Sequence, residues 1–547
     1  MNSLLLLLIG IVVFLVAYVL YGGYLAKQWG VDPKRETPAH TKFDNVDYCP
    51  ADARILLGHH FSSIAGAGPI TGPILAAVFG WVPVFLWILF GSVFIGGVHD
   101  FGALLASIRH DGKSIGEIIR VNIGERGKMI FNIFAWVTLI LVVAAFTDIC
   151  AATFAFDASK PTALVGAQAG TASLLFIILA MVFGFFVYRK NAPIGVSTVV
   201  GVVLLFLCIW IGYAFPIIKL TKVQWDVLLL IYISLASILP VWVLLQPRDY
   251  LCSFLLYAML IGAVVGIVIT HPSMQLAAYT SFTVKGQTLF PFLFVTVACG
   301  AISGFHSLVS SGTTSKQITK EAPDAKLIGY GAMLIEGLVA IIALIAVGYV
   351  AKSTGTPAQV FAGGVAVFMN SFGLPVAVGK VFVILAFSAF ALTSLDTATR
   401  IGRYIFQEFF DNASASAKKT FANIYFSTFI TVFASAALLI YGYAKIWPIF
   451  GSANQLLAGL ALLAISAWLA KSGRKYINTL LPMIFMFGVT LTALVLLMKQ
   501  YLFGAKPNFI LGTFAVVLFV LAIVLIIEAI SVFSNKPQSK GKEMKAN

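Results

Sequence analysis

Long apolar stretches alternate along the chain with short segments that carry charged residues, proline or glycine. The runs 4–25 and 509–532 are continuous and lack the alternation of polar and apolar positions that the strands of a membrane barrel show. A helix needs about 20 apolar residues to cross a bilayer and satisfies its own backbone hydrogen bonds in lipid. The pattern therefore predicts an all-α polytopic membrane protein with about 15 transmembrane helices. The predicted crossings are residues 3–26, 55–79, 83–108, 129–154, 171–188, 194–216, 226–246, 251–270, 289–316, 327–351, 376–399, 421–442, 447–470, 477–498 and 509–533.

These helices form a single domain, because no loop between them is long enough to fold as a soluble domain. We expect one transmembrane domain over residues 1–535, followed by a solvated cytoplasmic tail at 536–547. Within that domain, 1–26 is an extra N-terminal helix, 55–400 contains the core helices, and 421–533 adds further C-terminal helices.

The distribution of lysine and arginine predicts the orientation, because cytoplasmic loops carry an excess of both. With the N-terminus outside, 27 of the 36 lysine and arginine residues fall on the inner side and nine on the outer side. The excess repeats from loop to loop, so it supports the number of crossings as well as a cytoplasmic C-terminus. On this orientation the apolar stretch 358–372, which is too short to cross, is an interfacial or re-entrant segment on the outer side.

The composition excludes a soluble protein. Hydrophobic residues make up 60% of the chain and charged residues only 10%, whereas soluble domains carry about 25% charged residues. The net charge of +15 comes from residues in short loops, where membrane orientation explains it better than nucleic-acid binding. The five cysteines form no C-x-x-C pair and are interpreted as small core residues. The first 26 residues lack a basic start, which predicts a retained helix rather than a signal peptide.

The second predicted crossing contains an interrupted helix, with the string GHHFSSIAGAGPITGPI at residues 58–74. Three glycines and two prolines fall within eight positions and weaken a helix in the middle of the membrane. Transporters use such breaks to expose backbone groups to ions and substrates, and the helix that follows a break favours a carboxylate at its N-terminus. We expect Ser62, Ser63, Gly66 and Gly68 to line a substrate or ion site; the alternative is close helix packing through small residues.

A second polar stretch, CGAISGFHSLVSSGTTSKQ at 299–317, runs across the membrane in the opposite direction. Hydroxyl groups suit alkali cations, and a histidine at this depth is costly unless it has a partner or carries a proton. His60 precedes Gly66 by six residues and His306 precedes Gly312 by six, a faint repeat that inverted-repeat transporters would explain. For any single hydroxyl, a hydrogen bond to its own helix is the alternative. The candidate cation ligands in this stretch are Ser310, Ser311 and Thr313.

Other ionisable residues inside the predicted crossings are expected to face the protein interior. The pair His99 and Asp100 either relays protons or satisfies itself, and Glu336 is a further costly carboxylate. Asp396 and Arg400 are four residues apart and could form an ion pair on one helical face. No spacing in the chain is typical of a transition-metal site, and His59 and His60 point in different directions on a helix.

Two further motifs are interpreted as structural. Arg248 and Asp249 in QPRDY are expected to pair in a loop at the inner end of the seventh crossing. Asn454 and Gln455 in WPIFGSANQLLAG are expected to hold helices together through their amides.

Six strings in order through the chain carry a family resemblance: HHFSSIAGAGPITGP, GGVHDFG, QPRDYL, ISGFHSLVSSGTTSKQ, LTSLDTATR and WPIFGSANQLLAG. In these strings the chain is similar to the carbon starvation protein A family of bacterial membrane transporters. The resemblance implies a permease of the amino acid, polyamine and organocation superfamily, in the cytoplasmic membrane. Family members are associated with peptide uptake, and relatives with proton-driven pyruvate uptake, during nutrient limitation.

The resemblance also implies a LeuT-like fold with a five-plus-five inverted repeat and extra helices. Core helix one would be 55–79, core helix six 226–246 with Gln246, and core helix eight 289–316. Ser310 and Ser311 would then lie where many LeuT-like carriers ligate sodium. The alternative is a seven-plus-seven repeat that pairs 55–79 directly with 289–316.

The expected function is ion-coupled, proton-driven symport of pyruvate or a short peptide, without a cofactor or bound metal. The residues expected to carry the proton are His306, His60, His99 and Asp100. Alternatives are a sodium-coupled symporter of amino acids or organic anions and a membrane-embedded sensor or enzyme, for which no clustered catalytic residues are visible. The expected partners are a small-molecule substrate and the bilayer.

Overall fold

The computed structural model describes residues 2–44, 48–159, 163–240, 243–350, 355–411 and 413–534. The predicted cytoplasmic tail at 536–547 lies outside these residues. The described chain is mostly helical, with one two-stranded hairpin of β1 (Thr283–Val284) and β2 (Gln287–Thr288). The all-α class predicted from the apolar pattern is confirmed.

Among the described residues, 11 helices are long and apolar enough to cross a membrane, or up to 13 if two bent helix pairs each count as one crossing. The single crossings are Ser3–Gln28 (α1, Ser3–Val16, and α2, Gly22–Gln28), Trp81–Arg109 (α6, Trp81–Gly91, and α7, Gly97–Arg109), α9 (Glu125–Phe154), α10 (Ala163–Gly184), α11 (Ile194–Ala214), α13 (Leu245–Thr270), Lys326–Val350 (with α16, Ala332–Val350), α18 (Val376–Glu408), α21 (Tyr443–Lys471), α22 (Ile477–Phe503) and α23 (Phe509–Ser534). The bent pairs are α4 (Ala53–Ile64) with α5 (Gly68–Ala76) and α19 (Ala415–Phe421) with α20 (Ile424–Leu439). The remaining helices are α3 (Pro38–Thr41), α8 (Ile115–Asn122), α12 (Lys222–Ile238), α14 (Leu289–Thr296), α15 (Gly304–Gly312) and α17 (Pro357–Asn370).

Each of the fifteen predicted crossings overlaps one of these helices or helix pairs, but two differ in form. The predicted crossing 226–246 is the 17-residue helix α12, which ends at Ile238. Leu239 is extended because it precedes Pro240, and residues before proline avoid the helical region. The predicted crossing 289–316 is divided into the short helices α14 and α15.

The start of α13 also differs from the prediction. The QPRDY string lies in the first turns of this helix and is mostly buried, not in a loop. Pro247 is compatible with that position because the first turn of a helix does not need the N–H group that proline lacks.

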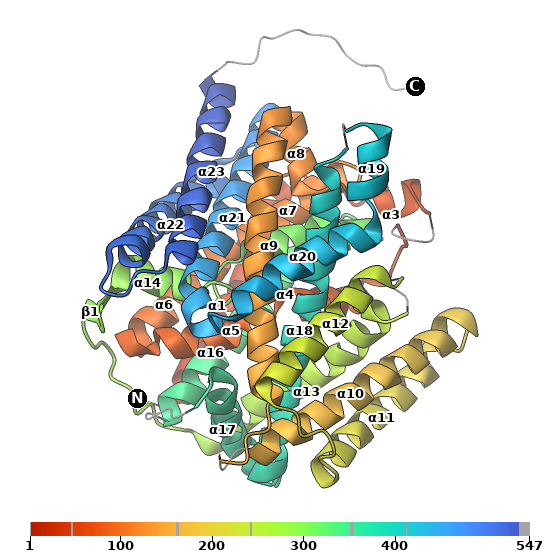
Figure 1. Ribbon diagram of the computed structural model, residues 1–547, viewed down its shortest axis with the longest axis vertical. Helices are drawn as coiled ribbons and strands as arrows, with labels where there is room; N and C mark the ends of the chain where they lie inside the picture. Colours follow the sequence, from red (N-terminus) through yellow and green to blue (C-terminus); the bar gives the residue numbers. More distant parts are fainter. Residues whose placement is uncertain are drawn as a thin grey trace.

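The helices differ strongly in how far the protein covers them. In the most apolar window of α21, 94% of the residues are buried, against 17% in α11. Figure 1 shows α21 and α9 running through the middle of the molecule, with α10 and α11 side by side at its lower right edge. The side chains that α11 exposes include the apolar residues Val196, Val199 and Val203. This is the distribution of a bundle whose outer helices face lipid.

Candidate functional site

The first interrupted helix breaks where its glycines are located. α4 ends at Ile64 and α5 begins at Gly68, and the two halves are bent by 43°. Gly66 has a positive φ of 21°, and a Cβ atom on it would lie 2.9 Å from Ser394 Oγ of α18. Glycine fits both constraints because it has no side chain. The predicted broken helix is confirmed.

The second break separates α14 from α15, between Thr296 and Gly304. Side-chain amides of α21 bind the backbone on both sides of it. Asn454 Oδ1 accepts a hydrogen bond from the Phe305 N–H at 2.9 Å, and Gln455 Nε2 donates to the Phe294 carbonyl at 2.6 Å. The amides predicted to join helices therefore satisfy backbone groups that the break releases.

The two breaks contact each other. A Cβ atom on Gly68 would lie 2.4 Å from Cys299 Sγ, and one on Gly72 would lie 2.7 Å from the Thr296 carbonyl oxygen. The helices can approach so closely because these glycines carry no side chain. The prediction that two interrupted helices meet is confirmed.

A fully buried acid–base group lies beside the breaks, and we call it the His306 cluster (His99, Asp100, His306 and Glu336). His306 Nδ1 is 2.8 Å from Asp100 Oδ2, and His99 Nδ1 is 2.6 Å from Asp100 Oδ1. On the other side of the ring, His306 Nε2 is 3.4 Å from Glu336 Oε2. The cluster joins α7, α15 and α16, and all four side chains are 0% exposed.

The sequence predicted His306, His99 and Asp100 as proton-carrying residues but assigned Glu336 no role in the site. The signal was present, since an uncompensated carboxylate in a crossing marks a functional site by default. What the sequence did not show is that the fold brings the Glu336 carboxylate of α16 to 3.4 Å from His306 Nε2 of α15.

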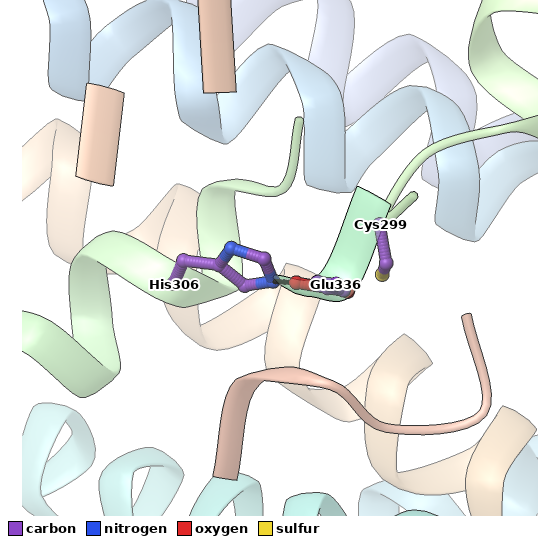
Figure 2. A group of neighbouring side chains, drawn as sticks. All are labelled: Cys299, His306 and Glu336. Carbon is purple, nitrogen blue, oxygen red and sulfur yellow. Dashed lines mark ion pairs between the residues drawn. The ribbon is translucent and has the colours of Figure 1, made fainter. Parts of the chain in front are cut away.

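Cys299 lies close to the same cluster. Figure 2 shows His306 and Glu336 pointing toward each other, with Cys299 beside Glu336. Donor atoms of Cys299, His306 and Glu336 all lie within 4.8 Å of one another. Neither Glu336 oxygen nor His306 Nε2 has a hydrogen-bond partner within the described chain. A proton between His306 Nε2 and a Glu336 oxygen would give both atoms a hydrogen-bond partner. Thiol, imidazole and carboxylate are also the ligand types that zinc accepts.

The remaining residues of the second polar stretch take different positions. Ser311 donates to the Ser307 carbonyl at 2.7 Å and Thr313 to the Val309 carbonyl at 2.9 Å, so both bond to their own helix region. The hydroxyl of Ser310 is buried and unpartnered among the described residues. His60 faces this stretch, with Nδ1 2.8 Å from Thr314 Oγ1.

Two of the residues predicted on the first broken helix, Ser62 and Ser63, bond to two different neighbouring helices, α13 and α18. Ser62 Oγ donates to the Asp249 carbonyl of α13 at 3.4 Å, whereas the Ser63 carbonyl accepts from Ser394 Oγ of α18 at 2.9 Å. The Ser63 hydroxyl itself is buried without a partner in the described chain. Gln246 is half-buried in the first turn of α13, and its predicted role at the site stays a prediction.

The predicted ion pair between Asp396 and Arg400 is wrong. Arg400 Nη2 donates to the Ala236 carbonyl at 2.8 Å, near the end of α12, where a positive charge is favourable. Asp396 instead binds Arg248 Nη1, and Arg248 Nη2 lies 3.2 Å from Asp249 Oδ1. The expected pair of Arg248 and Asp249 is therefore inside the bundle and not in a surface loop.

Comparison with known proteins gives one family and several relatives. The family model described as carbon starvation protein CstA matches residues 2–356 and 349–493. The peptide transporter CstA of Escherichia coli is 34% identical over 90% of this chain and 80% of its own length. The peptide transporter CstA of Bacillus subtilis is 32% identical over the full length of both chains. The pyruvate/proton symporter BtsT of Escherichia coli is 33% identical over 91% of this chain and 81% of its own.

Proposed function

This chain belongs to the carbon starvation protein CstA family, and we propose on that premise that it imports pyruvate or a short peptide in symport with protons when carbon is scarce. It is a multi-pass membrane protein and a secondary transporter, not an enzyme. One relative is named a peptide transporter and another a pyruvate/proton symporter. Peptides and pyruvate both carry a carboxylate.

The observation that carries proton coupling is the position of His306 between two buried carboxylates. With Asp100 and Glu336 both ionised, the cluster would hold two negative charges at 0% exposure. Burying such charges is unfavourable unless they are paired or neutralised. His306 contacts both carboxylates, so one proton bound there reduces the charge next to the two helix breaks. His60 and His99 are the neighbouring bases that would exchange it.

We propose that the substrate carboxylate binds at the first break. Gly66 lies just before α5 and Gly68 is the first residue of that helix, and the N-terminus of a helix favours an anion. The buried hydroxyls of Ser63 and Thr71 flank this break and have no hydrogen-bond partner within the described chain. We propose Ser62 of α4, Gln246 of α13 and Ser310 of α15 as further ligands of this site.

The proposed location is the bacterial cytoplasmic membrane, with the N-terminus outside and the C-terminus in the cytoplasm. The excess of lysine and arginine in alternate loops supports this orientation. The proposal requires no cofactor other than the coupling ion.

Sodium coupling is the second candidate, and the buried Ser310 hydroxyl without a partner favours it. Ser311 and Thr313 donate to carbonyls but keep lone pairs for a cation. A sodium gradient would then replace the pH gradient as the driving force.

The test uses purified protein in proteoliposomes and labelled pyruvate, lactate, amino acids or dipeptides, driven by a pH gradient or a sodium gradient. We expect a pH gradient to drive accumulation by the wild type. Glu336→Gln and His306→Ala should reduce accumulation at least tenfold, while exchange of substrate at equal pH continues in Glu336→Gln because binding does not need that charge.

The matched control is Glu36→Gln, the same substitution at an exposed glutamate, and it should behave as the wild type. Wild-type uptake that ignores both gradients would overturn the proposal. Unchanged accumulation by Glu336→Gln would remove the His306 cluster from the coupling step.

A further inference from the structure

A second group of buried charges joins α4, α12, α13 and α18, and we call it the Arg248 cluster (His59, Tyr232, Arg248, Asp249 and Asp396). Arg248 Nη1 binds Asp396 Oδ2 and the Tyr232 hydroxyl, and Tyr232 donates to Asp396 Oδ2 at 2.8 Å. Arg248 Nη2 contacts Asp249 Oδ1 at 3.2 Å. The other oxygen of that carboxylate, Asp249 Oδ2, lies 3.3 Å from His59 Nδ1.

The charges of this cluster do not balance without a proton. It contains one guanidinium and two carboxylates, and the Arg248, Asp249 and Asp396 side chains are 1%, 0% and 0% exposed. A surplus negative charge at that burial is unfavourable. The His59 side chain, 9% exposed, is the base in contact with the surplus carboxylate. A proton on His59 makes the cluster neutral.

The neighbouring groups do not supply the missing charge. From α4, His60 faces Thr314 instead. From α18, Arg400 bonds to backbone carbonyls at the end of α12. From α9 and α13, Cys150 and Cys252 are buried thiols without positive charge.

We infer that the Arg248 cluster is a second proton-binding site, separate from the His306 cluster, in which protonated His59 holds the half-helix α4 against Asp249 of α13. This rests on the proposed function, since a proton that fixes half of a broken helix has a role in transport only if that helix moves.

Further contacts place the His59 proton at the interface between α4 and α13. Phe61 stacks on Tyr257 of α13 with ring centroids 6.0 Å apart, and Ser62 bonds to the Asp249 carbonyl. Apart from the His59–Asp249 pair, these contacts are uncharged and do not change with pH. Loss of the His59 proton therefore removes the one charged link between the two helices in the described chain, and it leaves the surplus charge on Asp249 uncompensated.

The experiment measures thermal unfolding of the purified protein between pH 5 and pH 9, with no transport needed. The wild type should lose melting temperature as pH rises and His59 releases its proton. His59→Gln, which binds no proton, should lack this part of the decrease, and His59→Lys, which keeps a positive charge, should retain its stability further into the alkaline range. His40→Gln is the matched control at an exposed histidine and should follow the wild type.

Asp249→Asn provides a second test, in which the effect of His59→Gln is compared between two backgrounds. Asp249→Asn removes the surplus charge. In that background, His59→Gln should leave the dependence of melting temperature on pH unchanged and should alter the uptake rate at any pH less than twofold. Identical pH profiles for the wild type and His59→Gln would overturn the inference, as would equal effects of His59→Gln in both backgrounds. Wild-type uptake that does not depend on a pH gradient would overturn the proposed function. The melting experiment would still test whether His59 binds a proton at this cluster.

Discussion

Single glycines determine how closely the two broken helices approach. Gly68 lies against the side chain of Cys299, and Gly72 lies against the backbone at Thr296 and Val297. The neighbours differ in how they can respond, because a side chain can rotate whereas backbone atoms cannot. At both positions a methyl group would separate the breaks and change the geometry on which the proposed site depends.

Gly68→Ala should lower stability by about 1–3 kcal/mol through overpacking against Cys299 and reduce uptake more than tenfold. The measurement is thermal melting together with proteoliposome uptake. Gly363→Ala is the matched control, because that glycine lies in α17 with no atom within 4 Å of an added Cβ. It should melt at the same or a higher temperature, since alanine favours a helix over glycine by about 1 kcal/mol. Equal melting temperatures and uptake in both variants would contradict the contact between the breaks.

At the scale of elements, the interrupted helices depend on a continuous one. α21 is almost fully buried and presents Asn454 and Gln455 to the gap between α14 and α15. A membrane offers no water to the released backbone groups, so side chains of a neighbouring helix must bind them. The long helix α18 does the same for the first break, where Ser394 donates to the Ser63 carbonyl.

Asn454→Ala should cost about 1–3 kcal/mol, because it leaves the Phe305 N–H without its acceptor in a buried position. Uptake should fall with stability, as α15 carries His306. The comparison is Asn423→Ala, which removes an exposed cap from α20 and should cost about 1 kcal/mol without loss of uptake. Melting curves and uptake of the two variants, measured side by side, test whether the break between α14 and α15 needs the Asn454 amide. An Asn454→Ala protein as active as Asn423→Ala would show that the break does not need this amide.

For the whole molecule, the half-helix α4 (Ala53–Ile64) contacts two different surroundings through adjacent residues. His59 faces Asp249 of α13 and His60 faces Thr314 after α15, although the two histidines are adjacent in the chain. Successive residues on a helix point about 100° apart, which is why neighbours serve different surroundings. A displacement of α4 would therefore change the His59 contact with Asp249 and the His60 contact with Thr314 together, as coupling between proton binding and helix movement requires.

The proposed orientation gives a prediction about accessibility. Thr283→Cys in the β1 strand should react with a membrane-impermeant maleimide on intact cells, because its loop is predicted to lie outside. Ser416→Cys in α19 should react only after the membrane is opened, because its loop is predicted to be cytoplasmic. Both side chains are exposed, and the wild type controls for the five native cysteines. Labelling of Ser416→Cys on intact cells would reverse the orientation.

The sequence by itself determined the features that depend on local chemistry. Apolar runs predicted the helical crossings, and the glycines and prolines around Gly66 predicted the break, because backbone preference and the cost of polar groups in lipid act at the position where the residue stands. It also indicated that His306 and Asp100 needed partners.

Only the tertiary structure decided which partners these are. Asp396 binds Arg248, 148 residues away in the chain, and not Arg400 one turn along the same helix. Glu336 belongs to the site because the fold brings its carboxylate to 3.4 Å from His306 Nε2, which no local pattern reveals. A buried charge can be neutralised by any helix that packs against it, so its partner depends on how distant elements fold together, whereas its need for a partner is already present in the sequence.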